Sequence, residues 1–511
     1  MKLNSLKQMF RKIKSAIVLV LFISSMANGQ ESTIPSISNN YFRSPLDIPL
    51  YLAGSFGEIR PNHFHSGLDI KTNQREGYPV YAVADGYISR IRVQIGGFGN
   101  ALYVSHPNGL TSVYAHLQKF NPRITLALLQ NQYREQSFAQ DFALTPIEIP
   151  IKKGEIIAFS GNSGGSAGPH LHFEIRDTQT EETINPLIFG FDVKDHIKPV
   201  INSLYVYQTQ NNVFNEYTPK QFYAIKGTGD NYSLSNNALI SVNGEFGLGI
   251  SSYDLQDGTS NRNGLFSTTI KLDGNIIFET IISKFSFDNT RAVNAYIDYA
   301  AKLNSGIVIQ KGFTAQNPKV KFYNKLVNNG LITLTDDELH EIEYTVSDIK
   351  GNQSVLKFKV KNNPNLIVKS AAKTSNLINC LEDYTYQKNN LQVFIAKGTL
   401  YNDLNFTYKK TAKPKQNAFS EIHYIHNNYT PLHTGFELWI KADSTLIKHQ
   451  SKALIVNTNR SSQGGYFENG WVKTKPRNFG SFFIAIDTIA PNIVPVNIAN
   501  GKNMAGTSKM S

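Results

Sequence analysis

The 511-residue chain contains one cysteine, Cys380, and only five methionines and two tryptophans. A single cysteine cannot form a disulfide within the chain, so the folded state has to depend on packing. Beyond the first 29 residues, no apolar run approaches the roughly 20 residues needed to span a bilayer. No basic run with interleaved aromatic residues is present either, and we expect no nucleic-acid partner.

Aromatic residues of two kinds are abundant, with 25 Tyr and 31 Phe. Tyr and Phe, together with Val, Ile and Thr, suit the pleated and half-buried surfaces of β-sheets. We therefore expect a mostly β fold. A chain of this length exceeds one ordinary hydrophobic core, so about two to four domains are expected.

Residues 1–29 are typical of a secretory signal peptide. Basic residues precede the short apolar run Ala16–Ile23, and Ala27 and Gly29 place small residues before a cleavage point at Gln30. An uncleaved anchor helix is the alternative. We expect an exported protein, located in the periplasm, in the cell envelope or outside the cell, whose mature chain has no transmembrane segment.

Charge favours an envelope location over nucleic-acid binding. The formal net charge of +12 falls to +7 once the five basic residues of the N-terminal segment are removed. This moderate excess, spread over a long chain, favours loose attraction to an anionic cell envelope.

Pattern changes along the chain predict its division into segments. The pattern of residues 48–190 predicts short strands and tight turns. Later residues have the alternating aromatic and aliphatic pattern that is typical of β-sandwiches. We expect a signal peptide (1–29), an irregular lead-in (30–47), a β domain (48–190), two immunoglobulin-like β-sandwich domains (191–362 and 363–486) and a last segment (487–511).

An insert interrupts the first of these β domains. Leu126, Leu129 and Tyr133 occur at helical spacing among polar residues. This spacing predicts a short amphipathic helix within residues 121–150.

A short internal repeat marks the start of the sandwich domains. The seven residues from Asp195 to Ile201 agree at four positions with the seven from Asp487 to Ile493. We interpret both as the opening linker and first strand of an immunoglobulin-like module, with a chance match as the alternative. Residues 487–511 are too few for a sandwich, so they form a C-terminal strand or a truncated third module.

Histidines are concentrated between His63 and His172, where six of the twelve occur. His65 and Asp69 are four residues apart, and the intervening Gly67 disfavours a helix, so we expect a loop that runs into a strand. On a strand, His170 and His172 point to the same face. Three or four such nitrogen and oxygen donors suit zinc, although ligand type does not exclude manganese or iron. A turn with an ion pair and a surface strand are the ordinary alternatives.

The ordered set His65-x-x-x-Asp69, Tyr114-Ala115-His116 and Gly168-Pro169-His170-Leu171-His172 resembles the lysostaphin or LytM-type zinc metallopeptidases, which cleave peptide crosslinks in bacterial peptidoglycan. The resemblance covers about a quarter of the chain. It implies a LytM-type antiparallel β-sheet peptidase domain with one Zn²⁺ per chain. The implied metal ligands are His65, Asp69 and His172, and the implied catalytic histidines are His116 and His170.

The resemblance also implies a mechanism. A metal-activated water attacks the peptide bond, and His116 and His170 share the proton transfer and the stabilisation of the tetrahedral intermediate, in an order that the sequence leaves open. Two alternatives remain: a catalytically inactive envelope-binding regulator or scaffold of cell-wall hydrolases, and an adhesion protein whose β modules do the work. In each case, the β modules could bind envelope proteins.

Other histidines are expected to be structural. His63 lacks the four-residue offset to a carboxylate, and His106 is expected to bond a neighbouring strand or loop. His423, His426 and His433 lie close together in the sequence, but they straddle turns and have no acidic partner at matching spacing, so we expect no metal there.

Overall fold

The structure is a computed structural model that describes residues 40–209, 214–367, 376–492 and 494. The expected signal peptide lies outside the described residues, as does much of the last segment. Residues 487–492, which are described, contain no helix or strand. Within the described ranges, no helix combines the length and the apolar character needed to cross a membrane.

The expectation of a mostly β chain is confirmed, because strands far outnumber helices. We call residues 42–190 the first domain, 191–362 the second domain and 376–486 the third domain.

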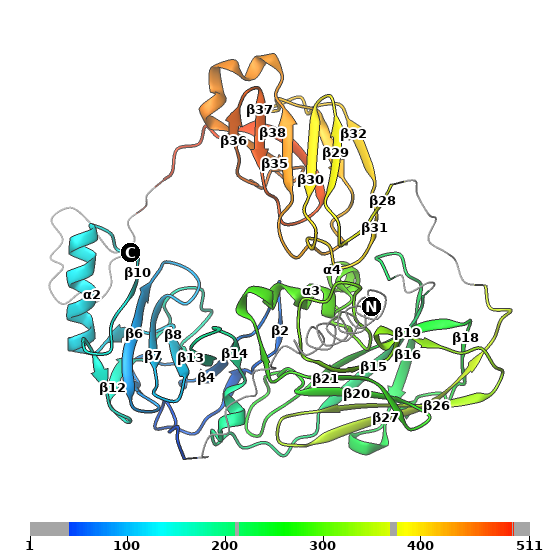
Figure 1. Cartoon of the computed structure of the whole chain (residues 1–511), viewed down its shortest axis with the longest axis horizontal. Helices are drawn as coiled ribbons and strands as arrows, with labels where there is room; N and C mark the ends of the chain where they lie inside the picture. The colour runs from blue at the N-terminus through cyan, green and yellow to red at the C-terminus, as the bar shows by residue number, and fades with distance from the viewer. Residues whose placement is uncertain (1–39, 210–213, 368–375, 493, 495–511) are drawn as a thin grey trace, which may run out of the picture. The chain divides into compact units, whose positions relative to one another are not determined.

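A large antiparallel sheet organises the first domain, in the order β1-β4-β13-β8-β7-β6-β10 (Figure 1). Central strand β13 alternates apolar and polar residues, with Leu171, Phe173 and Ile175 fully buried on one face. The polar residues from His172 to Arg176 on the other face are buried as well. The strands are β1 (Leu52–Gly54), β2 (Ile59–Arg60), β3 (His63–Phe64), β4 (Leu68–Lys71), β5 (Pro79–Tyr81), β6 (Gly86–Val93), β7 (Asn100–Ser105), β8 (Leu110–Ala115), β9 (Lys119–Phe120), β10 (Gln140–Ala143), β11 (Pro150–Ile151), β12 (Ile156–Phe159), β13 (His170–Asp177) and β14 (Thr183–Ile184).

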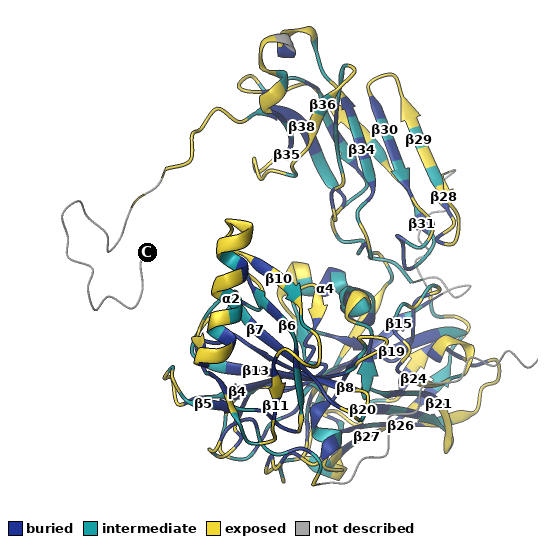
Figure 2. Cartoon of the chain, turned by 60° about the vertical axis from the view of Figure 1, so that its left-hand side comes forward, coloured by how far each residue is buried: buried dark blue, intermediate teal, exposed yellow. Residues whose placement is uncertain are grey.

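The insert contains α2 (Pro122–Glu135), which begins after the N-cap residue Asn121. Much of the surface of α2 is exposed, as Figure 2 shows. Its apolar stripe does not face the protein: Leu126, Leu129 and Tyr133 are 58%, 42% and 74% exposed. The short helix expected within residues 121–150 is thus present, but the apolar stripe that indicated it is exposed. The inward side of α2 instead presents Ile124 and the polar Asn131. The side-chain amide of Asn131 donates a hydrogen bond to the side chain of Gln140 in β10.

Sheet pairing joins the first domain to the second. Strand β14 pairs with β13 on one side and with β22 (Lys284–Phe285) of the second domain on the other. Phe285 also stacks on Phe56 of the first domain, with ring centroids 4.7 Å apart. The two domains thus share one sheet and several aromatic contacts, among which Phe64 of the first domain also contacts Phe285, Tyr296 and Phe322 of the second. This junction positions the loops before β4.

The second domain contains two six-stranded sheets, whose facing sides form one apolar core. Strand β18 is parallel to β27, and the other pairs are antiparallel. Besides β22, the elements are β15 (Val200–Gln208), β16 (Lys220–Lys226), β17 (Ser233–Leu234), β18 (Ile240–Val242), β19 (Glu245–Tyr253), β20 (Ser267–Leu272), β21 (Asn275–Ile281), α3 (Val293–Tyr296), α4 (Tyr299–Ser305), β23 (Gln310–Lys311), β24 (Tyr323–Leu326), β25 (Ile332–Thr333), β26 (Leu339–Ser347) and β27 (Gln353–Asn362).

In the third domain, a five-stranded and a four-stranded antiparallel sheet enclose a separate apolar core. Its strands are β28 (Leu377–Ile378), β29 (Tyr384–Lys388), β30 (Leu391–Ile395), β31 (Leu404–Asn405), β32 (Tyr408–Thr411), β33 (Ile422–Ile425), β34 (Glu437–Lys441), β35 (Ala453–Asn457), β36 (Tyr466–Glu468), β37 (Trp471–Thr474) and β38 (Gly480–Ile486).

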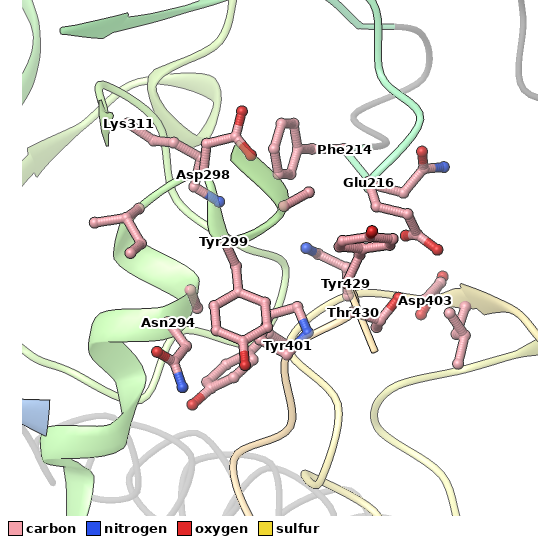
Figure 3. A pocket seen from close by; sticks show the side chains of 17 residues that line it. Phe214, Glu216, Asn294, Asp298, Tyr299, Lys311, Tyr401, Asp403, Tyr429 and Thr430 are labelled. Atoms are coloured by element: carbon pink, nitrogen blue, oxygen red, sulfur yellow. The ribbon is translucent and has the colours of Figure 1, made fainter. Parts of the chain in front are cut away.

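Figure 3 shows a pocket lined by Asp298 and Lys311 of the second domain and by Tyr401 of the third. Its charged groups have partners nearby. Asp298 accepts hydrogen bonds from Lys220 Nζ (2.6 Å) and from the Tyr207 hydroxyl (3.0 Å). Burial lowers the pKa of Lys311 to about 8. This arrangement is typical of a polar contact between domains and contains none of the residues singled out by the sequence.

Acid is expected to destabilise the third domain through His423. The ring is almost fully buried, and its Nδ1 is hydrogen-bonded to the Tyr408 hydroxyl (3.0 Å). Burial lowers its pKa from 6.5 to about 4, so the unfolded chain binds a proton between these values that the folded domain does not. The free energy of unfolding should therefore fall by on the order of 2–3 kcal/mol as the pH drops from about 6.5 to 4.

Urea unfolding followed by tryptophan fluorescence tests this expectation, because both tryptophans, Trp439 and Trp471, lie in the third domain. The His423→Leu variant removes the titrating group and should show a shallower pH dependence. If the variant and the parent lost stability equally on acidification, His423 would not be the cause.

Candidate metal centre

Three of the side chains singled out by the sequence lie together in the first domain. His65 follows β3, Asp69 lies in β4 and His172 lies in β13, opposite Asp69 in the sheet register. His65 Nε2 is 3.1 Å from Asp69 Oδ1 and 3.1 Å from His172 Nδ1, and the latter two atoms are 2.9 Å apart. All three residues are buried, with exposed fractions of 3%, 5% and 4%.

These three atoms suit one tetrahedral cation. With zinc bonds of about 2.0–2.1 Å, the ligand atoms of a tetrahedral site lie about 3.3 Å apart. The observed separations of 2.9 to 3.1 Å are close to that value. Two imidazoles and a carboxylate are donors that zinc accepts, as do manganese and iron. The three residues form a group that could hold a metal ion, and their role as ligands stays a prediction.

Each of the two histidines is oriented by a second hydrogen bond. His65 Nδ1–H donates to the carbonyl of Ser55 (2.8 Å), and His172 Nε2–H donates to Glu174 Oε1 (2.9 Å). With a metal ion bound, such outer partners would fix the tautomer of each ring and leave the lone pair of the other nitrogen, His65 Nε2 or His172 Nδ1, facing the centre.

The carboxylate of Asp69 is held ionised by its surroundings. Burial alone would raise its pKa, but the nearby His65 and hydrogen bonds from His170 and His172 lower the pKa well below its ordinary value. Arg60 Nη2 donates to Asp69 Oδ2 (2.7 Å), which leaves Oδ1 facing the two histidines. The geometry therefore presents one anionic oxygen to a cation.

Glu174 is the buried carboxylate that contacts His172 on the side away from Asp69. It accepts hydrogen bonds from Arg176 Nε (2.6 Å) and from the Ser66 hydroxyl. Burial would raise its pKa, but the Arg176 guanidinium and His172 lower it to about 2. Burial would lower the pKa of His172, yet Asp69 and Glu174 raise it to about 9. The His172 side of the centre thus favours a cation, whether a proton or a metal ion.

The two other histidines singled out for the active site lie beside this group. His116 follows β8 with a φ of 58°, and its Nδ1–H donates to the Ser163 carbonyl (2.8 Å). His170 begins β13, and its Nδ1–H donates to the Gly168 carbonyl (2.8 Å). The two ring centroids are 4.7 Å apart. A positive φ costs energy for a histidine, and such strain concentrates at functional sites.

The protonation of His116 follows from its environment. Burial, and then the nearby His172 and His170, lower its pKa to about 4. The ring is therefore neutral at neutral pH. Because Nδ1–H is engaged with the Ser163 carbonyl, the lone pair is on Nε2, where it can accept a proton.

The remaining histidines lie apart from the centre. His63 is exposed and bonds the Pro61 carbonyl (3.0 Å), and His106 bonds the Asp85 carbonyl and the Ser112 hydroxyl (2.8 Å each). Among the described residues, the three histidines near the end of the chain do not belong to a group that could hold an ion. Their bonding partners are Tyr408 for His423, Glu216 for His426 and Tyr401 for His433.

Three residues that orient the centre were not assigned a role from the sequence. Ser55 acts through its main-chain carbonyl, and Arg60 reaches Asp69 across a turn, so neither leaves a recognisable pattern. Glu174, by contrast, could have been recognised in the sequence. It follows His172 by two residues, and side chains two residues apart on a strand point to the same face.

Comparison with protein families identifies this region. Residues 63–127 match the model of Peptidase family M23, and residues 375–487 match that of the Zu5-like domain. The first domain thus contains a region that is similar to Peptidase family M23. The resemblance to LytM-type peptidases seen in the sequence motifs is confirmed for this region.

Individual proteins are similar to the same part of the chain. An uncharacterized metalloprotease of Haemophilus influenzae is 35% identical over 131 residues, which are 26% of this chain and 21% of that protein. A DD-carboxypeptidase/endopeptidase of Neisseria meningitidis serogroup B is 36% identical over 112 residues, which are 22% of this chain and 20% of that protein. The chain therefore matches only about a fifth of the length of these relatives.

Solved structures also match about a quarter of this chain. A zinc-containing peptidase from Vibrio cholerae has 27% identity and a TM-score of 0.20, covering 27% of this chain and 36% of that one. The catalytic domain of lysostaphin from Staphylococcus simulans has 25% identity and a TM-score of 0.19, covering 26% and 87%.

Proposed function

We propose that the chain is a zinc-dependent endopeptidase that hydrolyses peptide crosslinks or stem peptides of bacterial peptidoglycan. The observation that carries this proposal is the approach of His65, Asp69 and His172 to a common point, with His116 and His170 beside it. Relatives support the substrate class through their names, which include a DD-carboxypeptidase/endopeptidase and a glycyl-glycine endopeptidase.

In this proposal, His65 Nε2, Asp69 Oδ1 and His172 Nδ1 hold one zinc ion. When bound, zinc lowers the pKa of a water molecule and polarises the scissile carbonyl. His116, which is neutral and has its Nε2 lone pair available, accepts the proton of the attacking water. His170 lies next to it and helps to stabilise the charge that develops on the carbonyl oxygen.

The proton that His116 has accepted is needed again when the peptide bond breaks. The C–N bond breaks and the histidine pair returns the proton to the leaving amine, while the carbonyl carbon becomes a carboxyl group that releases its remaining proton to solvent. Two adjacent imidazoles allow this transfer without a glutamate base, because a neutral imidazole both accepts and donates protons near neutral pH.

The same proposal places the protein outside the cytoplasm. Residues 1–29, which lie outside the described residues, have the sequence of an export signal. Peptidoglycan is reached only after export. The second and third domains are then proposed to bind components of the envelope and to hold the first domain near its substrate.

Digestion of purified peptidoglycan tests the function. Zinc-loaded protein is expected to release soluble fragments, and mass spectrometry of these fragments should show new peptide termini at one bond. Sacculi with direct D-Ala–diaminopimelate crosslinks and walls with glycine bridges provide two arms that identify the bond. If zinc-loaded protein released nothing from either wall, the peptidase proposal would fail, and the inactive regulator would be the better description.

Arg60→Met is expected to weaken zinc binding by about 10- to 100-fold, the usual effect of losing an outer partner of a ligand. Arg60 Nη2 orients Asp69 through one hydrogen bond, and its side chain is 28% exposed, so the substitution should not disturb the core. Competition with a chromophoric zinc chelator measures the affinity.

Arg90→Met is the matched control for this change. Arg90 lies in the same domain and also pairs with an aspartate, Asp141, but at a surface site. Its loss should leave zinc affinity unchanged. Equal zinc affinities for the Arg60 variant and the parent would mean that Asp69 is oriented without the guanidinium.

A further inference from the structure

Three aspartates of the second domain, here named the acid cluster, converge on one point. Asp195 precedes β15, Asp254 follows β19 and Asp348 follows β26. Each offers a carboxylate oxygen, and the three oxygens lie within 4.8 Å of one another. Asp254 and Asp348 are buried and Asp195 is half-buried. Segments that are far apart in the sequence thus bring three acidic groups together inside the protein.

Two buried oxygens at the acid cluster have no hydrogen-bond partner among the described residues. They are Oδ1 of Asp254 and Oδ1 of Asn263, and each of these residues is only 5% exposed. The main chains of the two residues pair with each other, at 3.0 and 2.9 Å. Both side chains line the same cavity as the rest of the cluster. Buried polar atoms without a partner are rare and call for an ion or water that satisfies them.

The acid cluster has little positive charge around it. Lys350 is the one basic side chain among the described residues that line the cavity, and it is exposed. Burial, and then the proximity of Asp195 and Asp348, raise the pKa of Asp254 to about 8. Mutual repulsion of this kind is relieved when a cation binds between the carboxylates.

We propose that the acid cluster and Asn263 bind one calcium ion. All four donors are oxygens, the ligand type that calcium prefers. Calcium–oxygen bonds of about 2.3–2.6 Å place two ligands of one ion at most about 4.6–5.2 Å apart. The spread of the carboxylate oxygens, within 4.8 Å, fits this limit. Asp195, the first residue of the repeated heptapeptide, thereby gains a role as a ligand.

The calcium site lies at the base of a loop that holds the first domain. This clamp loop, residues 255–262, connects Asp254 to Asn263. Within it, Gln256 Nε2 donates to the Leu50 carbonyl, and its Oε1 accepts from the N–H of Leu52 (both 2.9 Å). Lys71 Nζ also donates to a threonine hydroxyl of the loop (2.7 Å). Calcium is therefore expected to fix the ends of the clamp loop and stabilise the junction.

Ser55 connects this junction to the candidate metal centre. Its hydroxyl accepts a hydrogen bond from the N–H of Gly264 (2.9 Å), the residue that follows Asn263. Its carbonyl accepts from His65 Nδ1–H (2.8 Å). An effect of calcium on the orientation of His65 rests on the proposed zinc function, but the calcium site itself does not.

Calorimetric titration of the zinc-loaded full chain with calcium chloride tests the proposal. One ion per chain is expected, with a dissociation constant of about 10⁻⁴ M or tighter, in the range of extracellular calcium sites. At about 2 mM calcium the melting temperature should rise by about 3 °C or more, because the ion binds only the folded chain. Absence of both binding heat and a melting shift would overturn the proposal, as would an equal response to magnesium.

Substitutions locate the site. Asp254→Asn should weaken calcium binding at least about tenfold, and in calcium-free buffer it should melt no lower than the parent, because a neutral amide of the same shape replaces a buried carboxyl group whose ionisation beside Asp195 and Asp348 is unfavourable. Asp336→Asn, an exposed aspartate of the same domain, is the control and should bind calcium like the parent. Unchanged binding in Asp254→Asn would overturn the proposal. His172→Ala should keep the calcium response, which separates this test from a failure of the zinc function.

Discussion

The His172→Ala variant is expected to lose its zinc, and its activity on peptidoglycan should fall by at least about 10³-fold. The reason is that the metal contributes several kcal/mol of transition-state stabilisation, and about 1.36 kcal/mol corresponds to a tenfold change in rate. His172 Nδ1 is the donor closest to Asp69, at 2.9 Å, and Glu174 fixes its tautomer. Without it, two donors remain, fewer than the three protein ligands of a catalytic zinc site. Zinc content by mass spectrometry and fragment release measure the two losses.

His63→Ala is the control for this experiment. His63 lies two residues from His65 but is exposed and bonds only to a main-chain carbonyl. Its removal should change neither zinc content nor activity. Full zinc content in His172→Ala would reject the ligand set, and a loss of both properties in His63→Ala would point to damage of the whole loop.

The approach of these side chains could be predicted only in part from local patterns. Alternation along residues 170–176 gives a strand with its histidines on one face, because apolar residues recur at every second position. That His172 lies opposite Asp69 depends on the register of β13 against β4. Register is set by packing across the sheet, and only the resemblance to a known family indicated this pairing.

Non-local contacts account for what the sequence did not reveal. The acid cluster brings Asp195 together with Asp348, two residues separated by most of the second domain, and neither has a local motif for metal binding. Pairing of β14 with β22 across two domains is likewise invisible in either strand alone. The exposure of the apolar stripe of α2 has a related reason: helical spacing shows that a stripe exists, but the packing partner decides whether the stripe is buried.

His116→Ala is expected to reduce kcat by about 10²- to 10⁴-fold while zinc content stays at one per chain. The reason is that its Nε2 is proposed to accept a proton, whereas its Nδ1 is held by the Ser163 carbonyl and neither nitrogen is among the proposed metal donors. Fragment release at saturating substrate, measured together with metal content, separates a lost proton acceptor from a lost metal.

His170→Ala provides the comparison that assigns the two roles. If His116 accepts the proton and His170 stabilises charge on the carbonyl oxygen, both single variants should retain zinc. The double variant should then lose little more than the worse of the two, because groups that act as a unit on one transition state are not additive. Their rings are 4.7 Å apart, close enough for this dependence. Strictly additive losses would instead mean that the two histidines act in separate steps, and loss of zinc in either variant would make that histidine part of the metal site.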